Sequence, residues 1–445
     1  RTGGRELKSD SEWMRRLAAR RDTATPSQRP PELPVASAPA EDSMLIDEHD
    51  LLADDEDLEI DEVVEVKESW GADELQKPAL VKGFEIAGFN PALQVAATLE
   101  KKIGRADSEP NEDNLIADAT LGGDGFIAVA DELGGAEKKG ASKLLAEVLP
   151  DILREELTKA AALDANTLLQ DLVAAELARY PLLEPNLVER RLKGLISGDR
   201  KMAEKAWALF HGLALANDRI RPTKSTTTFC GGFMHQREDG TWWTVMANVG
   251  DSAGSKIGPD GSVEELFTED SMLQLLLDSG IFDEEKIRNM RENPDEVVTF
   301  RINEAMGIAL GLPRAVAQRL NTDIEKYQKM SYREMKSKMV RALGSDSATP
   351  ALAYTKYEPG SKAMLETDGT KDLMQAKGSE ETDTALVANS FTNDQSLTSQ
   401  VDTYRELANK RGTERAAVNK VSDDKAVALI GFPKTKMDAA QSAAA

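Results

Sequence analysis

Cysteine and histidine are scarce in this sequence. Its 445 residues include one cysteine, Cys230, and three histidines, His49, His211 and His235. A zinc site built on thiolates or imidazoles, a disulfide framework and a Ser-His-Asp triad all need such residues in suitable combinations, so the sequence argues against each of them. A single cysteine is typical of proteins in a reducing compartment, which predicts a cytoplasmic location.

Long apolar runs and an excess of positive charge are missing as well. No apolar run in the sequence approaches the roughly 18 residues that a membrane-spanning helix needs, so we expect no membrane association. The formal net charge is −23, which argues against nucleic acid as a ligand because phosphate backbones would be repelled. Hydrophobic residues make up 40% of the chain, enough for one large domain that carries an extension.

The extension is predicted at the N-terminus, over residues 1–83. A stretch rich in Pro, Ala and Ser at Pro26–Pro39 precedes an acidic run at Glu48–Glu65. Such segments bury too little apolar surface to offset the loss of chain entropy, so we predict a disordered acidic extension. The alternative is a docking segment that folds on a basic partner. A short tail, residues 436–445, is also expected to be frayed.

Residues 84–435 have the alternating patterns of a folded domain. Apolar residues recur at helical spacing around residues 144–157 and 202–216, and strand-like runs joined by Gly-containing turns follow at Ser225–Met234 and Thr241–Asn248. Residues 283–340 are mostly polar and are predicted to form a helical insertion or flap. Strands, then helices, then strands again predict the α+β class, with two stacked antiparallel β-sheets covered by helices.

Acidic residues follow several of the predicted strands. Asp131 ends the apolar run Phe126–Ala130, and Asp368, Asp251 and Asp423 stand at the ends of three other strand-like runs. If these strand ends meet at one pole of a sandwich, the carboxylates can share hard cations. Oxygen ligands suit Mg²⁺ or Mn²⁺. The alternative is that these acids are ordinary turn residues of a structural sandwich.

Eight short motifs extend this pattern over roughly residues 84–433. Together they resemble the metal-dependent Ser/Thr protein phosphatases of type 2C, the PPM family, whose motifs occur in the same order. The resemblance implies a β-sandwich flanked by helix pairs, in α-β-β-α layers, with a binuclear Mg²⁺ or Mn²⁺ centre at one end. The motifs are NEDN (111–114), AVADELGG (128–135), STTT (225–228), NVGDS (248–252), TED (268–270), RALGS (341–345), ETDGTKDLM (366–374) and SDDKAVALI (422–430).

The resemblance also implies roles for individual acids. Asp131 would bridge both metal ions, and Asp368 and Asp423 would complete the ligands of the first ion. These three residues would act in catalysis through water that the metals activate. Glu112 and Asp113 would hold the second ion through water.

Three further residues complete the implied metal ligands. The backbone carbonyl of Glu132 would bind the second ion, and its carboxylate is a further candidate ligand. Asp251 and Asp372 match the acids of a third, more loosely held ion. With these ions in place, the implied activity is hydrolysis of phosphoserine and phosphothreonine in phosphoprotein substrates, with no covalent phosphoenzyme.

The sequence departs from the family pattern around the substrate. Glu132 stands where the family has Gly, and Ser108 stands where the family has its phosphate-holding Arg. Arg105 is the nearest replacement for that Arg. Lys224 and Ala253 replace a Gly and an Arg beside two other motifs. We therefore predict a metal-dependent protein phosphatase, and keep as the alternative a pseudophosphatase of the same fold that acts as a binding or regulatory module.

Overall fold

The computed structural model describes most of residues 80–433 and little outside that range. The predicted acidic extension, apart from its last few residues, and the C-terminal tail lie outside the described residues, so both predictions stay untested. Nothing in the structure supports a basic partner for residues 48–65. The described residues are 80–90, 92–100, 111–133, 140–180, 183–196, 199–309, 327–345, 348–371, 387, 390–391, 395–416 and 425–433.

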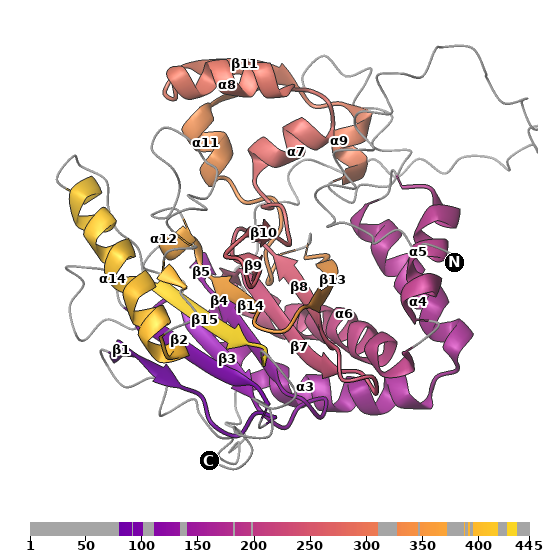
Figure 1. Cartoon of the computed structure of the whole chain (residues 1–445). Coiled ribbons are helices and arrows are strands. Elements are labelled where there is room, and N and C mark those ends of the chain that lie inside the picture. Colours follow the sequence, from indigo (N-terminus) through magenta and orange to yellow (C-terminus); the bar gives the residue numbers. More distant parts are fainter. Residues whose placement is uncertain are drawn as a thin grey trace, which may run out of the picture.

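Two antiparallel sheets form the centre of the fold (Figure 1). The first has five strands in the order β13-β8-β7-β4-β3, and the second has six in the order β1-β2-β15-β14-β9-β10. The strands of the first sheet are β3 (Asn114–Asp118), β4 (Phe126–Ala130), β7 (Phe229–Gln236), β8 (Trp242–Val249) and β13 (Ala351–Tyr357). Those of the second are β1 (Leu80–Glu85), β2 (Gln94–Glu100), β9 (Ala253–Ile257), β10 (Val263–Glu265), β14 (Lys362–Glu366) and β15 (Lys425–Gly431). A two-stranded ladder, β5 (Glu132–Leu133) with β6 (Thr226–Thr227), extends beyond β4 and β7.

Helices cover the outer faces of both sheets. On the five-stranded sheet the covering helices are α3 (Ala141–Ala162), α4 (Ala165–Arg179), α5 (Pro185–Ile196) and α6 (Arg200–Ile220), and a short 3₁₀ turn, Arg221–Thr223, follows α6. On the six-stranded sheet it is α14 (Leu397–Ala416), whose Val401, Tyr404 and Ala408 pack against Val427 and Leu429 of β15. The predicted α+β class with two stacked antiparallel sheets is confirmed. Side chains such as Ile127, Val129 and Ala428 fill the space between the sheets.

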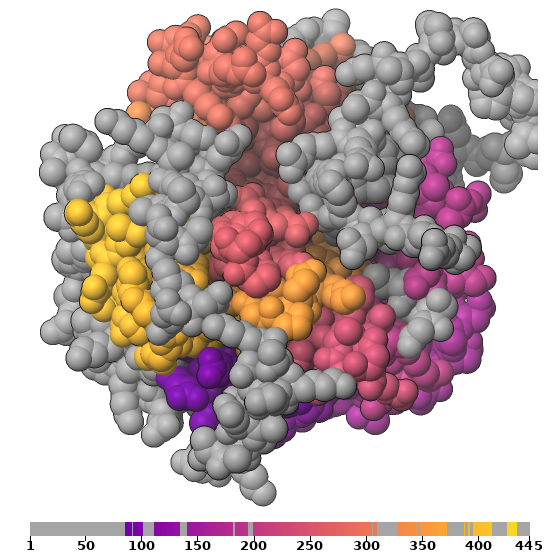
Figure 2. Space-filling view, viewed as in Figure 1, coloured from indigo at the N-terminus to yellow at the C-terminus, as the bar shows by residue number. Residues whose placement is uncertain are grey.

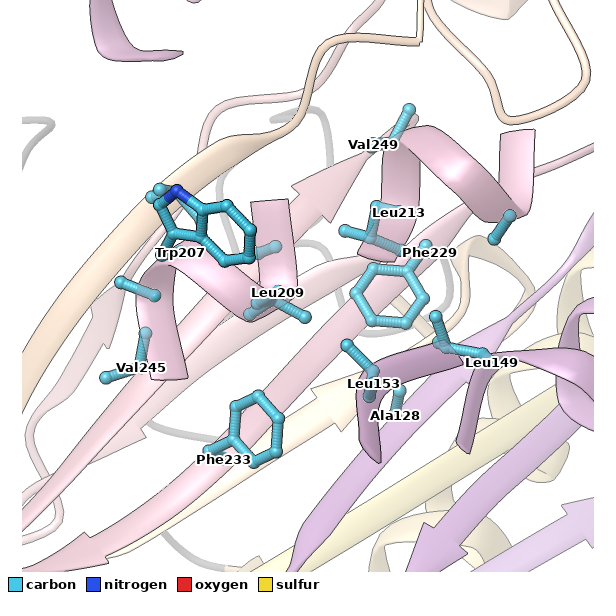
Figure 3. Packing of buried hydrophobic residues seen from close by; sticks show 14 of the residues in the cluster. Ala128, Leu149, Leu153, Trp207, Leu209, Leu213, Phe229, Phe233, Val245 and Val249 are labelled. Carbon is cyan, nitrogen blue, oxygen red and sulfur yellow. The ribbon is translucent and has the colours of Figure 1, made fainter. Parts of the chain in front are cut away.

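The face of the five-stranded sheet that meets α3 and α6 carries the largest apolar cluster (Figure 3). Phe229 and Phe233 of β7 lie against Leu149 and Leu153 of α3, and all four are fully buried. Alternation along the strand places these side chains on the helix-facing side. Burying such a side chain contributes about 1.5–3 kcal/mol.

Glycine allows close approach at two points of this layer. A Cβ added to Gly232 of β7 would lie 2.0 Å from the carbonyl oxygen of Val245, and one added to Gly212 of α6 would lie 2.7 Å from Leu153 Cδ2. At Gly232 the clash is with backbone, so the position needs a residue without a side chain, whereas at Gly212 the end of the Leu153 side chain would have to shift.

The described residues 272–309 and 327–338 form a separate lobe at one end of the sandwich (Figures 1 and 2). Its helices are α7 (Met272–Asp278), α8 (Glu284–Glu292), α9 (Glu304–Ala309) and α11 (Tyr332–Ser337). The prediction of a helical insertion was incomplete, because the lobe also contains a pair of antiparallel strands, β11 (Val297–Arg301) and β12 (Tyr327–Ser331). The β-branched run at Val297–Thr299 favours this strand.

The lobe has its own apolar core and a narrow attachment. Twelve buried residues, among them Phe282, Phe300 and Met306, pack with one another and form a cluster distinct from those of the sandwich. The two chain segments that enter and leave the lobe are bridged at Ser271 and Met339. Across the described residues, no helix combines the length and apolar character needed to cross a membrane.

Candidate metal centre

Strand register brings the predicted acids to one end of the sandwich. In the five-stranded sheet Asn114 pairs with Ala130, so Asp113 and Asp131 leave β3 and β4 at the same edge. Phe229 pairs with Val249, which places the loop with Asp251 beside that edge. In the other sheet Glu366 pairs with Ala253, so the segment Thr367-Asp368 also leaves near Asp251. Strand register therefore brings the segments that carry Asp113, Asp131, Asp251 and Asp368 to the same end of the sandwich.

Asp131 stands at the centre of this group. Burial, the charges of Asp113 and Asp368, a hydrogen bond with the Asp113 side chain and the charge of Asp251 all raise the pKa of Asp131 well above its ordinary value. Like charges that are close together and poorly hydrated resist joint ionisation. A bound cation would relieve this repulsion.

Asp251 has an oxygen atom without a partner. Its Oδ1 is inaccessible to water and makes no hydrogen bond within the described part of the chain, although the residue as a whole is partly exposed. Burial, Asp368 and Glu269 raise the pKa of Asp251 well above its ordinary value, while Lys371 opposes the shift. A buried carboxylate oxygen without a donor is costly, and a cation would remove that cost.

The donors present fit a hard divalent cation. All are carboxylate oxygens, the ligands that Mg²⁺ and Mn²⁺ prefer. In the described ranges, however, no three acidic, His or Cys side chains stand close enough together to ligate one ion. Carboxylate side chains can rotate towards an ion, and a bound cation would offset the repulsion between these crowded like charges. Two predicted ligands, Asp423 and Asp372, lie outside the described residues.

Asp113 is held in place from the far end of the sequence. It is 1% exposed, and its Oδ2 accepts a hydrogen bond of 2.6 Å from Thr367 Oγ1. Thr367 Oγ1 in turn accepts one from the Ala426 amide at 3.0 Å. The backbone carbonyl of the neighbouring residue, Glu112, accepts hydrogen bonds from Ser142 Oγ at 2.7 Å and from the Glu132 amide at 3.3 Å. The Asp113 side chain also forms a hydrogen bond with the Asp131 side chain.

The STTT motif clamps the backbone of Asp131. The Asp131 amide donates to Thr228 Oγ1 at 3.0 Å, and the Asp131 carbonyl accepts from Thr227 Oγ1 and from the Thr228 amide, both at 2.8 Å. Thr228 Oγ1 also lies 2.6 Å from Ser252 Oγ. The two threonines had no predicted role, and only the motif pointed to them. They fix where the Asp131 carboxyl group can reach.

The Glu132 side chain faces the N-terminus of α3 and not the acid cluster. Its Oε1 accepts from the amides of Gly140 at 2.5 Å and Ala141 at 3.1 Å, and from Ser225 Oγ at 2.7 Å. Its Oε2 accepts from Ser142 Oγ at 3.2 Å. The Glu132 carboxylate, which the sequence made a candidate metal ligand, therefore caps a helix instead. Of the two groups of Glu132 that were predicted to bind metal, only the backbone carbonyl remains a proposed ligand.

A lysine lies beside the acids. Lys371 ends the one-turn helix α12 (Asp368–Lys371), is 8% exposed, and donates to Glu269 Oε1 at 2.5 Å. Burial opposes its charge, but Glu269, with help from Glu265 and Asp251, raises the pKa of Lys371 above its ordinary value. Sequence reasoning missed both Lys371 and Glu269, although both belong to motifs that it had singled out.

Arginines near the centre are paired with Asp270. Asp270 Oδ1 accepts from Arg179 Nη2 at 2.5 Å and from Arg341 Nη1 at 3.0 Å, and its Oδ2 accepts from the Gly250 amide at 3.0 Å. Arg105, the predicted phosphate ligand, lies outside the described residues. The Asp270 network joins the lobe attachment to the loop that carries Asp251.

Comparisons with known proteins agree on the fold. No protein-family profile matches the chain, and no curated protein matches it. Solved structures with a similar fold include the PPM Ser-Thr phosphatase MsPP from Mycobacterium smegmatis in complex with cacodylate, which is 18% identical, with 76% of this chain and 97% of that chain covered and a TM-score of 0.42. The serine/threonine phosphatase PstP/Ppp from Mycobacterium tuberculosis is 16% identical, with 77% and 99% covered and a TM-score of 0.40. PppA from Pseudomonas aeruginosa, a regulatory component of T6SS, is 15% identical, with 76% and 98% covered and a TM-score of 0.40.

The first of these structures is described as a PPM Ser-Thr phosphatase, and PPM is the family that the sequence motifs resemble. At such identities and TM-scores the similarity carries no argument about chemistry. The case for a function rests on the acid cluster itself.

Proposed function

We propose that this chain is a metal-dependent protein phosphatase that hydrolyses phosphoserine and phosphothreonine in phosphoprotein substrates. One observation carries the proposal: Asp113, Asp131, Asp251 and Asp368 converge on one end of a β-sandwich, and burial together with mutual repulsion raises the pKa of Asp131 and Asp251. A group of acids that resists ionisation on its own is suited to bind divalent cations. Acids in ordinary turns face water, whereas Asp113 and Asp131 are buried.

Mn²⁺ or Mg²⁺ is the proposed cofactor, with two ions in the centre. Asp131 would contact both, Asp368 and Asp423 would complete one set of ligands, and Asp113 or Glu112 with the Glu132 carbonyl would serve the other. When bound, the ions would supply Lewis-acid activation of a water molecule near neutral pH. Thr227 and Thr228 hold the Asp131 backbone, and so limit the positions that its carboxylate can reach.

Divalent cations would also be needed for substrate binding, because the carboxylates of the cluster are negatively charged. A phosphate monoester is anionic, and the bare cluster presents several carboxylates to it, so the two would repel each other. Arg105 is the proposed residue for holding the phosphate. A cytoplasmic location, for which the single cysteine argues, is part of the same proposal.

Hydrolysis of a phosphopeptide tests the proposal. With Mn²⁺ the full chain should release phosphate, and chelator should abolish the release. Asp131→Asn should lower the rate by more than the roughly 100-fold that loss of a supporting residue costs. Asp260→Asn is the matched control, because Asp260 lies in an exposed turn where it accepts from Ser262, and it should leave the rate unchanged. Equal rates for the two variants would contradict the proposal.

A pseudophosphatase is the second candidate, and one observation favours it. Arg179 and Arg341, which lie beside the loop carrying Asp251, both pair with Asp270. Neither arginine is therefore available to bind a substrate phosphate, and Ser108 stands where the family has its phosphate-holding Arg. Under this candidate, calorimetry would show Mn²⁺ binding that Asp131→Asn abolishes, while the phosphopeptide stays intact.

A further inference from the structure

The carboxylate of Glu132 is held at four points. Its Oε1 accepts from the amides of Gly140 and Ala141 and from Ser225 Oγ, and its Oε2 accepts from Ser142 Oγ. The residue is only 8% exposed, so water competes little for these donors. Rotation of the side chain would leave a buried carboxylate without hydrogen bonds, which is costly. The carboxylate is therefore fixed relative to the first turn of α3.

The backbone of Glu132 points towards another proposed ligand. Thr227, its partner in the β5–β6 ladder, exchanges both of its backbone hydrogen bonds with Leu343, at 2.9 Å each. Glu132 and Thr227 are therefore a pair without mutual hydrogen bonds, and in such a pair the amide and the carbonyl of each residue point away from the partner strand. On that side the Glu132 amide donates to the Glu112 carbonyl at 3.3 Å. The Glu132 carbonyl, a proposed ligand of the second ion, thus points to the side of β5 on which Glu112 lies.

Ser142 connects the side chain of Glu132 to the backbone of Glu112. Its Oγ lies 2.7 Å from the Glu112 carbonyl oxygen and 3.2 Å from Glu132 Oε2, and it accepts from Asn114 Nδ2 at 2.8 Å. One hydroxyl group therefore contacts both residues that are proposed to serve the second ion. The first turn of α3, the Glu132 carboxylate and the NEDN segment are joined as one unit.

A helix cap alone does not require this position in the sequence. Glu132 directly follows Asp131, whose carbonyl is held by Thr227 and Thr228, so its anchored side chain fixes the next peptide along the chain. A ligand whose orientation is already fixed loses less freedom when it binds. Residues that orient the ligands of a metal ion typically change its affinity by about 10–100-fold.

We propose that Glu132 is a positioning residue for the second metal ion. Its carboxylate, anchored to α3 and Ser225, fixes the direction of its own backbone carbonyl and so sets the affinity of that ion. This inference rests on the proposed metal centre. It gives a role at the centre to the residue that stands where the family has Gly.

Mn²⁺ binding to the full chain, followed by calorimetry, tests the proposal. Glu132→Ala should weaken the binding of one of the two Mn²⁺ ions by about 10–100-fold and change the binding of the other ion less. Glu132→Gln keeps an acceptor oxygen for the same donors, so it should recover most of the lost affinity. An alanine variant with the affinity of the wild type, or a glutamine variant as weak as the alanine variant, would overturn the proposal.

Asp164→Ala is the matched control, because it removes a helix cap outside the proposed centre. Asp164 caps α4, where it accepts from the amides of Asn166 at 2.9 Å and Thr167 at 3.0 Å. It lies beyond the far end of α3, whose 22 residues span about 33 Å. This variant should lose stability but bind Mn²⁺ as the wild type does. A matching loss of affinity would mean that Mn²⁺ binding only follows helix stability, and the proposal would fail.

Ser225→Ala decides the case in which Glu132→Ala does not fold. It removes one of the four contacts of the carboxylate, so it should weaken the same ion by a smaller factor. Unchanged Mn²⁺ affinity in this variant would contradict the proposal.

The outcomes also separate this inference from the proposed function. If the wild type hydrolyses phosphopeptide with Mn²⁺ but Glu132→Ala binds both ions normally, the inference fails and the function stands. If the wild type binds Mn²⁺ without hydrolysis and Glu132→Ala weakens one ion, the function fails and the inference stands. A wild type that binds no Mn²⁺ would overturn both.

Discussion

At the scale of single residues, Glu132 shows how one side chain can join the site to its scaffold. It directly follows Asp131 in sequence, and its carboxylate closes the N-terminus of α3, which has no capping side chain from Gly140. The helix dipole also stabilises a negative charge at the N-terminus of the helix. A residue that the family pattern marks as a departure thus has a structural role here.

Glu132→Ala should lower the free energy of unfolding by about 1–3 kcal/mol, because a cap is lost and Ser225 and Ser142 lose a buried acceptor. Glu132→Gln, which keeps an acceptor oxygen, should lower it less. Urea denaturation in chelator measures both. Equal stability of the alanine variant and the wild type would mean that the cap contributes nothing.

Lys205 is a second residue whose environment has a measurable consequence, at the opposite end of β7 from Asp131. Its Nζ donates to the Met234 carbonyl at 2.7 Å, and Asp124, Asp199 and His235 surround it. Burial lowers the pKa of Lys205 from 10.5 to about 8, although the two aspartates oppose the shift.

The stability that Lys205 contributes should therefore rise with pH. Between pH 8 and 10.5 the unfolded chain binds the Lys205 proton more tightly than the folded chain does, so stability increases as pH rises through this window. The difference in unfolding free energy between wild type and Lys205→Met should shift in favour of the wild type by up to about 3 kcal/mol. Urea denaturation of both proteins at the two ends of the window is the measurement, and a constant difference would contradict the lowered pKa.

At the scale of elements, the attachment of the lobe is the junction with most consequence for the site. The chain enters the lobe after Asp270 and returns at Arg341, and these two residues pair with each other at 3.0 Å. Val340 donates from its amide to the Asp270 carbonyl at 2.8 Å. Since Arg179 of α4 also pairs with Asp270, one carboxylate joins α4, both segments of the attachment and the Asp251 loop.

Asp270→Asn should destabilise the fold by about 3–5 kcal/mol, the range for breaking a buried pair and leaving its cations without a partner. Hydrogen exchange of the lobe should increase at the same time, because the attachment loosens. Asp295→Asn is the matched control: Asp295 pairs with Arg333 at 2.7 Å, but both side chains are mostly exposed, so the change should cost at most about 1 kcal/mol. Similar losses in the two variants would show that burial does not govern these pairs.

At the scale of the whole molecule, the sandwich and the lobe have separate cores. The lobe's apolar cluster is formed within the described residues 272–309 and 327–340. The clusters of the sandwich take their members from the sheets and from α3, α4, α5, α6 and α14. The lobe therefore adds little to the packing of the sandwich. It stands at the end that carries α12 and the acid cluster (Figure 1).

Removing the lobe tests this separation. Ser271 and Met339 are partners in an antiparallel bridge, so a two-residue Asn-Gly turn can replace residues 272–338. The shortened chain should unfold cooperatively, with a melting temperature within about 8 °C of the full chain, which corresponds to roughly 2–4 kcal/mol for a domain of about 150–250 residues. Circular dichroism melting is the measurement. A chain that no longer unfolds cooperatively would show that the sandwich depends on the lobe.

Much of this architecture could be predicted from local patterns. The alternation in Thr241–Asn248 and the helical spacing around residues 144–157 predicted β8 and α3, because burial on one face imposes a period on the sequence. The strand β11 was not predicted, since its polar surroundings conceal a short β-branched run whose partner, β12, lies about 30 residues further along the chain.

The sequence by itself determined the two-sheet class, the order of its elements and the identity of the acids at the strand ends, because each depends on contacts between neighbours in the chain. Only the tertiary structure decided how these acids are supported. The pairing of Asp113 with Thr367, the hydrogen bond from Ser225 to Glu132 and the position of Lys371 beside Glu269 all join residues far apart in sequence. Strand register decides such contacts, and register follows from the packing of whole sheets, which no short motif contains.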